Sequence, residues 1–182
     1  MEKINVALLI LCLLVLNTTS CRRDSYEESL PLVTQTGKNT FGCLVNGLVW
    51  RNKGPAPFPS PNLYFSRSLI SQIIAIRSED DNIYQVISIS TKIPISVGKY
   101  SLNGLNYQAK FINNITSCYY QADSISASGE LEITKFDTLN NIISGLFNFK
   151  ATKFNSINIV SKGNCDSTLS ITEGRFDIHT FN

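Results

Sequence analysis

The sequence has little of what enzymes commonly use for catalysis. It contains a single histidine, His179, and charged residues make up only 16% of the chain. It has no His-Glu-x-x-His, no Gly-x-Ser-x-Gly, no glycine-rich phosphate-binding loop and no EF-hand pattern. It also lacks a Cys-x-x-Cys pair, so no metal site and no cofactor are expected. We predict from these absences that the protein is not an enzyme.

Strong charge of either sign is missing as well. The net charge is +2, which predicts no nucleic-acid partner. The chain is instead rich in Asn, Ser and Thr. This composition is typical of an exported β protein whose turns and solvent-facing positions use neutral polar groups.

The N-terminus has the organisation of an export signal. Lys3 precedes an apolar run of about 11 residues, too short to span a bilayer as a helix, and small polar residues follow as far as Ser20. Cys21 comes next, and this arrangement resembles the lipobox of a bacterial lipoprotein. We predict a lipoprotein signal peptide over residues 1–20 and a membrane anchor of lipid on Cys21. The protein would then lie in the cell envelope, on the periplasmic face or on the outer surface of the outer membrane.

An ordinary secretory signal, with Cys21 left as a free thiol, is the alternative. Thr18 stands where a lipobox usually has leucine. A free thiol outside the cytosol is a chemical liability, which favours lipidation. Residues 21–37 follow as a predicted flexible tether, because they are polar and show no sustained period.

Residues 38–182 are predicted to form one β domain. Asn46-Gly47 between apolar flanks is a strong hairpin signal. About ten short alternating segments, separated by turn residues and without a helical period, predict an all-β fold. The expected architecture is a single antiparallel β-sandwich or barrel-like domain.

Alternation also assigns faces to the strands. Ile87 and Ile89 are expected to share one strand face, as are Ile143, Phe147 and Phe149 on a later strand. Leu131, Ile133 and Lys135 are expected on one face of their strand, against Glu130, Glu132 and Thr134. In the last segment Phe176 and Ile178 are expected to point inward, and Arg175, Asp177 and His179 are expected on the opposite face. Gly145 interrupts the pattern and predicts a bend or bulge.

Three cysteines remain in the domain. Export would place Cys43, Cys118 and Cys165 in an oxidising compartment, where an odd number allows one internal disulfide. Cys118 and Cys165 lie in polar, turn-like sequence, whereas Cys43 lies in an apolar run. We predict a Cys118–Cys165 disulfide, with Cys43 buried as a small hydrophobic residue.

Aromatic residues outside the core pattern are the candidate ligand contacts, because aromatic faces stack on sugars and anchor protein interfaces. They are Trp50, Phe58, Tyr64, Tyr119 and Tyr120. Core packing is the alternative for each. The expected partner is an envelope protein or a glycan.

A carboxylate-dependent hydrolase acting on envelope or extracellular glycans is the alternative function. Glu130 and Glu132 would share one strand face, about 7 Å apart, and glycoside hydrolysis needs only two carboxyl groups several Å apart. Alternating acids more often form a solvated face. Base catalysis by His179 is a weaker hypothesis, because it occupies an expected solvent-facing position.

Several segments resemble a family of small Bacteroidota lipoproteins of unknown function. Besides Cys21 after its short signal, they are residues 39–50, Ile142–Phe149 and Ile171–Asp177, where Thr-Glu-Gly-Arg-Phe-Asp is the most specific stretch. Members often have Thr-Phe after Ser-Gly, whereas this chain has Leu146-Phe147. The resemblance implies a single β domain on a lipid tether and brings no activity or functional residues.

Exported proteins of this kind can carry O-glycans where Asp is followed by Ser or Thr and a small or aliphatic residue. The matching positions are Ser124, Thr138 and Ser167. The alternative is that these pairs simply form turns. Together, the sequence predicts a membrane-anchored envelope lipoprotein with a non-catalytic binding or structural role.

Overall fold

The computed structural model describes residues 29–51, 63–67, 72–80, 83–104, 106–122, 129–154 and 163–179. These residues form eleven strands, all paired antiparallel, and no helix. The strands are β1 (Thr40–Val45), β2 (Leu48–Arg51), β3 (Leu63–Arg67), β4 (Gln72–Asp80), β5 (Ile83–Thr91), β6 (Gly98–Ser101), β7 (Tyr107–Asn113), β8 (Cys118–Gln121), β9 (Gly129–Asp137), β10 (Ile142–Lys153) and β11 (Thr168–His179). The predicted all-β, antiparallel fold is confirmed.

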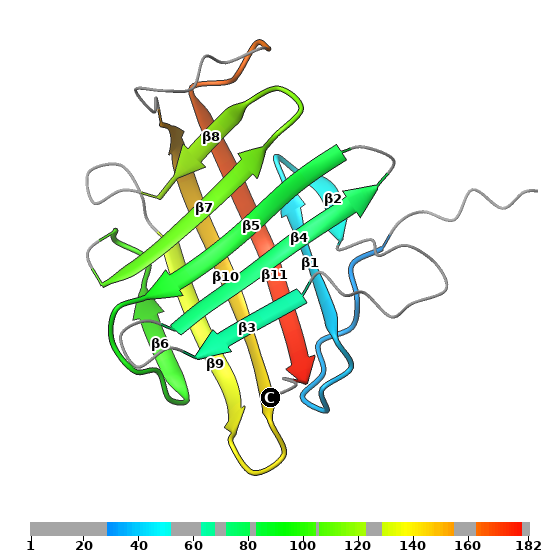
Figure 1. Cartoon of the computed structure of the whole chain (residues 1–182), viewed down its shortest axis with the longest axis vertical. Coiled ribbons are helices and arrows are strands. Elements are labelled where there is room, and N and C mark those ends of the chain that lie inside the picture. Colours follow the sequence, from blue (N-terminus) through cyan, green and yellow to red (C-terminus); the bar gives the residue numbers. More distant parts are fainter. Residues whose placement is uncertain are drawn as a thin grey trace, which may run out of the picture.

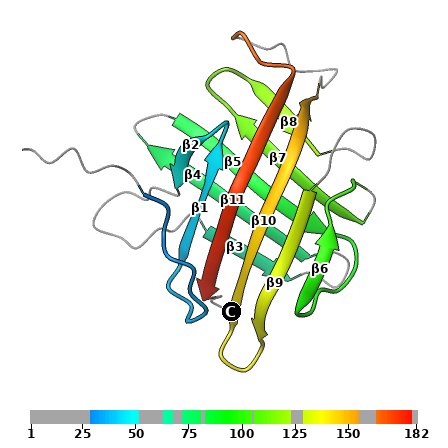
Figure 2. The ribbon, with the colours of Figure 1, turned by 180° about the vertical axis from the view of Figure 1, so that it is seen from behind.

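The strands form two layers that cross at an angle (Figures 1 and 2). One, the β10 layer, has the order β2-β1-β11-β10-β9-β6, and the other, the β5 layer, has the order β8-β7-β5-β4-β3. The long strand β10 joins them. Residues 142–149 pair with β9, while Thr152 and Lys153 pair with Gln121 and Tyr120 of β8.

The core lies between the layers. Alternation predicted its residues well, because Ile87 and Ile89 of β5 are buried in one core cluster with Ile143, Phe147 and Phe149 of β10. The remaining large core residues include Phe41, Leu102, Phe111, Leu131, Ile133, Ile171, Phe176 and Ile178. Burial of these apolar surfaces is the main stabilising contribution to the fold.

The Asn46-Gly47 hairpin is confirmed. Asn46 has φ 49° and Gly47 has φ 81°, the left-handed values that a two-residue type I′ turn requires. Asn46 also fastens the hairpin to β11, since its side-chain Oδ1 accepts the N–H of Ser170 at 2.9 Å.

A β-bulge in β9 makes the predicted face of Lys135 wrong. Between β10 and β9, Ser144 pairs with Lys135 and Gly145 with Ile133, so Thr134 is an extra residue. The bulge reverses the alternation, and Lys135 therefore points outward, where its Nζ donates to the Gln35 carbonyl oxygen at 3.1 Å. Gly145 faces this irregularity, as predicted. A Cβ there would collide with the Phe176 ring at 2.6 Å and with the carbonyl oxygen of Glu132.

The predicted disulfide between Cys118 and Cys165 is confirmed, with a Cα–Cα distance of 5.8 Å. Cys43 is a free, fully buried thiol, and burial raises its pKa to about 12. The thiol is therefore inert at neutral pH.

Candidate functional site

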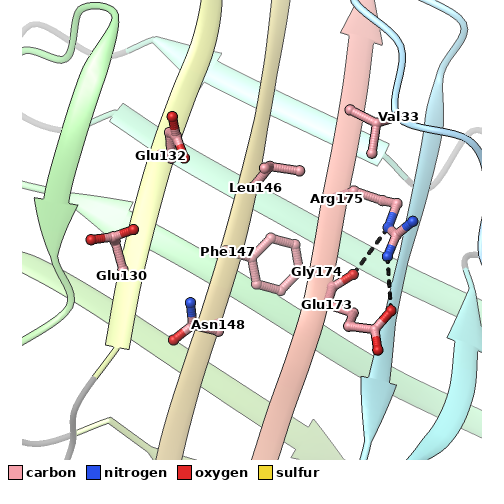
Figure 3. A pocket seen from close by; sticks show the side chains of 9 residues that line it. All are labelled: Val33, Glu130, Glu132, Leu146, Phe147, Asn148, Glu173, Gly174 and Arg175. Carbon is pink, nitrogen blue, oxygen red and sulfur yellow. Dashed lines mark hydrogen bonds and ion pairs between the residues drawn. The ribbon is translucent and has the colours of Figure 1, made fainter.

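A groove crosses the outer face of the β10 layer (Figure 3). It encloses about 330 Å³, near the lower end of the usual range for ligand pockets. Its lining residues are Val33, Glu130, Glu132, Leu146, Phe147, Asn148, Glu173, Gly174 and Arg175. Strands β9, β10 and β11 supply all of them except Val33.

Strand register arranges the groove in cross-strand rows. Glu132 of β9 lies opposite Leu146 of β10, which lies opposite Arg175 of β11. In the next row, Glu130 lies opposite Asn148. Since side chains two residues apart on a strand share a face, alternating positions of three strands converge on one surface.

A second β-bulge shapes the β11 side of the groove. Gly174 pairs with Phe147, and Ile171 pairs with Phe149. Between these two pairs β11 advances by three residues while β10 advances by two, so β11 carries one extra residue. Glu173 within the bulge has φ 52°, a value that is uncommon for a residue other than glycine. Its carbonyl oxygen accepts Arg175 Nε at 3.1 Å, and its carboxylate accepts Nη2 at 3.2 Å. The bulge therefore fixes Arg175 beside the groove.

The groove floor is closed by an aromatic ring. Phe147 is only 3% exposed, and it stacks on Phe41 at a centroid distance of 5.1 Å. A Cβ on Gly174 would meet three of its ring atoms at 2.5–2.6 Å. The ring of Phe147 thus occupies the space that any larger residue at position 174 would need.

Ion pairs occupy the β9 side of the groove. Lys99 of β6 donates to Glu130 at 2.9 Å and lies 3.7 Å from Glu132. The hydrogen bond to Glu130 and the charges of both carboxylates raise the pKa of Lys99. The pairs are exposed to solvent, and exposed ion pairs contribute little to stability and exchange partners readily.

The last side of the groove comes from the N-terminal segment Leu30–Lys38, which we call the strap. Its Val33 lines the groove. Leu30 and Pro31 pack against Gly42, where a Cβ would meet Pro31 Cδ at 2.5 Å. Most of the strap was predicted to belong to the tether of residues 21–37, so the contacts of the domain extend further toward the N-terminus than that boundary.

Asp177 holds the strap to β11. Its carboxylate accepts Thr34 Oγ1 at 2.6 Å and Ser144 Oγ at 2.7 Å. It also accepts the backbone N–H groups of Thr36, Gly37 and Lys38 at 3.0, 2.8 and 3.2 Å. Figure 2 shows the strap beside β1 and β11 on this face. Asp177 is 1% exposed, because the strap covers the outward position that alternation assigned to it.

Burial by itself raises the pKa of a carboxyl group. At Asp177 the hydrogen bonds from Thr34, Ser144, Gly37 and Lys38 outweigh that effect and hold the pKa at about 2, below the ordinary value of 3.8. The carboxylate is thus charged, buried and fully engaged in structural bonds.

Residues 68–177 match the family described as Domain of unknown function (DUF6252). The chain belongs to this family. No curated protein and no solved structure matches the chain. The DUF6252 segment contains every groove residue except Val33, and it ends at Asp177, whose partners Thr34 to Lys38 precede the segment.

The three predicted aromatic contacts whose side chains the structure describes, Trp50, Tyr119 and Tyr120, do not line the groove of this DUF6252 protein. Trp50 is 8% exposed, and its Nε1 donates to Gln85 Oε1 at 2.7 Å across the two layers. Tyr120 is buried against Phe111. Tyr119 is partly exposed on β8, in the opposite layer. Core packing, the alternative interpretation, describes Trp50 and Tyr120.

Several other predicted sites lie outside the part of the chain that the structure describes. These are Cys21, Phe58, Ser124 and the side chain of Tyr64. Thr138 and Ser167 are exposed. At Thr138 the preceding Asp137 carboxylate accepts the N–H groups of Leu139 and Asn140, so this Asp-Thr pair also has a structural role in its turn.

Two further features bear on chemistry. No group of three or more metal-ligating side chains occurs among the described residues, and none of the described elements is a helix able to cross a bilayer. His179 lies at the end of β11, where its backbone N–H donates to Asn39 Oδ1 at 2.9 Å.

Sequence reasoning identified Glu130 and Glu132 but missed the other parts of the groove. Arg175 was assigned only to a face, and Val33 was placed in the tether. The signal available for Asp177 was an acidic residue between Phe176 and Ile178 in a strand, which indicates a charge held close to the core.

Proposed function

We propose that this protein is a small lipoprotein of the Bacteroidota cell envelope, anchored by lipid on Cys21, whose β-sandwich is a non-catalytic binding module. The observation that carries the proposal is the groove over β9, β10 and β11. It combines apolar, amide and charged side chains on one solvent-facing surface of the sheet. Concave surfaces with a few convergent polar groups are the usual form of ligand sites.

The strap supports anchoring close to this groove. Leu30 is nine residues after Cys21, and nine residues span at most about 30 Å. A lipid on Cys21 would therefore keep the domain within roughly that distance of the membrane. The groove would face partners held on or near the same surface.

A carboxylate-dependent hydrolase is the second candidate, because three carboxylates line the groove. Glu130 and Glu132 lie on β9, and Glu173 lies two strands away on β11. Their side chains are 47%, 35% and 60% exposed, and each has a cationic partner. A general acid in glycoside hydrolysis is usually a carboxyl group that its surroundings keep protonated, which favours binding over catalysis here.

Anchoring is tested by removing the lipidated residue. We expect Cys21→Ala to leave the domain folded while transferring it from the membrane fraction to the soluble fraction. Detergent partitioning and membrane flotation of the wild type and the variant measure this, with Cys43→Ala as a matched cysteine control. Continued membrane retention of folded Cys21→Ala protein would contradict the lipoprotein assignment.

The binding role is tested by filling the groove. Leu146→Trp places a large side chain on the outer face at the centre of the groove, and tryptophan suits a β-strand. Lys150→Trp makes the same addition on the same strand and face, outside the groove lining. Soluble Cys21→Ala protein carrying either change serves as bait in cross-linked native envelopes.

We expect Lys150→Trp bait to retain its partner and Leu146→Trp bait to lose it. Equal capture by the two baits would show that the groove is not the binding surface. Hydrolysis of an envelope glycan by wild-type protein, lost in Glu130→Gln, would instead support the second candidate.

A further inference from the structure

The groove has a negative side on β9 and a positive side on β11, two strand spacings apart. Glu132 and Arg175 lie on either side of Leu146 in one cross-strand row. Adjacent strands are about 4.8 Å apart, which separates the two backbone positions by about 9.6 Å. The two side chains are therefore held apart by an apolar residue, and a ligand between them meets an acid on one side and a cation on the other.

The cationic side has hydrogen-bonding capacity left over. A guanidinium group has five N–H donors, and Arg175 uses Nε and Nη2 on Glu173. Since Glu173 is largely exposed, its carboxylate is held weakly and can be displaced, while its carbonyl oxygen still orients Nε. Arg175 is thus placed to form the paired hydrogen bonds that guanidinium makes to carboxylates.

The acidic side has the complementary property. In the part of the chain that the structure describes, Glu130 and Glu132 share a single cation, Lys99, whose side chain is 62% exposed. The carboxylates outnumber the cation, and an exposed lysine exchanges easily with another ammonium group. This side favours a ligand amine.

The groove lining also distinguishes peptide from glycan. Sugar sites commonly offer an exposed aromatic face for stacking. Among the described residues Phe147 is the sole aromatic one in the lining, and it is almost completely buried. Asn148 instead offers an amide that can both donate to and accept from a peptide group, and Leu146 offers a small apolar contact.

We infer that the groove binds a short peptide through its two charged ends, with the ammonium group against Glu130 and Glu132 and the carboxylate against Arg175. An extended di- or tripeptide spans about 7–11 Å, which matches the separation of the two sides. The inference rests on the proposed function, since it names the ligand class of the same groove.

The test uses trialanine as a probe against the exported Cys21→Ala chain. N-acetyl-trialanine lacks the ammonium group and trialanine amide lacks the carboxylate. Isothermal titration is expected to show trialanine binding, weakened at least 10-fold by either cap. In the Arg175→Gln variant, the affinities for trialanine and for its amide should differ by no more than about twofold. The variant lacks the guanidinium group that would recognise the peptide carboxylate.

The groove variants supply the controls. Lys150→Trp should bind trialanine as the wild type does, and Leu146→Trp should abolish binding while circular dichroism shows a folded sheet. Equal affinity for free and capped peptides, or no binding of any form by folded wild-type protein, would overturn the inference.

Failure of the inference is separable from failure of the proposed function. If envelope capture depends on an open groove while trialanine does not bind, the binding module stands and the peptide class is wrong. An oligosaccharide captured in the same groove-dependent way would also leave the binding module standing and exclude the peptide class. Equal capture by Leu146→Trp and Lys150→Trp baits would instead show that the groove is not the binding surface, which contradicts the proposed function as well.

Discussion

Asp177→Asn is expected to lower the free energy of unfolding by about 3–5 kcal/mol and to free the strap from β11. Five donors from two parts of the chain converge on this buried carboxylate. Hydrogen bonds to a charged group contribute roughly 1.5–3 kcal/mol each, though not additively. The asparagine amide keeps the shape but presents two donors of its own toward N–H groups.

Chemical denaturation measures the loss in stability, and hydrogen exchange of residues 34–38 measures release of the strap. The matched control is Asp137→Asn. Asp137 also accepts backbone N–H bonds, from Leu139 and Asn140 in the β9–β10 turn, but its side chain is partly exposed to solvent, at 22%. We expect that control to cost less than about 1 kcal/mol. Similar losses in the free energy of unfolding for the two variants would show that Asp177 does not hold the strap against β11.

The same residue predicts a dependence on pH. The folded pKa of Asp177, about 2, lies below its ordinary value of 3.8. A lowered folded pKa gives stability that is present above about pH 4 and lost as the pH falls through about 2. The stability difference between the wild type and Asp177→Asn should therefore be constant from pH 7 to about pH 4 and narrow below it. A difference that stays constant down to pH 2 would contradict this assignment.

The strands of this fold were predictable because alternation is a local property. Apolar residues two positions apart on a strand lie on the same face, as with Ile87 and Ile89 or with Phe147 and Phe149. The prediction failed at Lys135 because an extra residue, Thr134, shifts the alternation by one. Nothing in the local sequence marks that shift, which depends on how β9 meets Gly145 of the neighbouring strand.

The site was less predictable than the fold, for a different physical reason. The strap and Asp177 are about 140 residues apart in sequence, and polar residues such as Thr34 and Gln35 carry no local signal for folding onto a sheet. The row from Glu132 to Arg175 likewise depends on strand order and register. Those follow from how the whole core packs.

Phe147→Ala is expected to destabilise the domain by about 3–5 kcal/mol, the usual cost of deleting a buried phenylalanine. The ring stacks on Phe41 and lies near the rings of Phe149 and Phe176, so its loss leaves a cavity under the groove. Gly174→Val alone should cost about 3 kcal/mol, because the new Cβ would overlap the Phe147 ring.

The double variant Phe147→Ala with Gly174→Val should be more stable than the sum of the single changes predicts. The valine occupies part of the space that the ring vacates, and an aromatic residue paired with a cross-strand glycine fills the same space in the wild type. Denaturation of all four proteins gives a coupling free energy, expected at about 1–3 kcal/mol in favour of the pair. Strictly additive losses would mean that the ring of Phe147 does not occupy the space above Gly174, and the groove would then have a different floor.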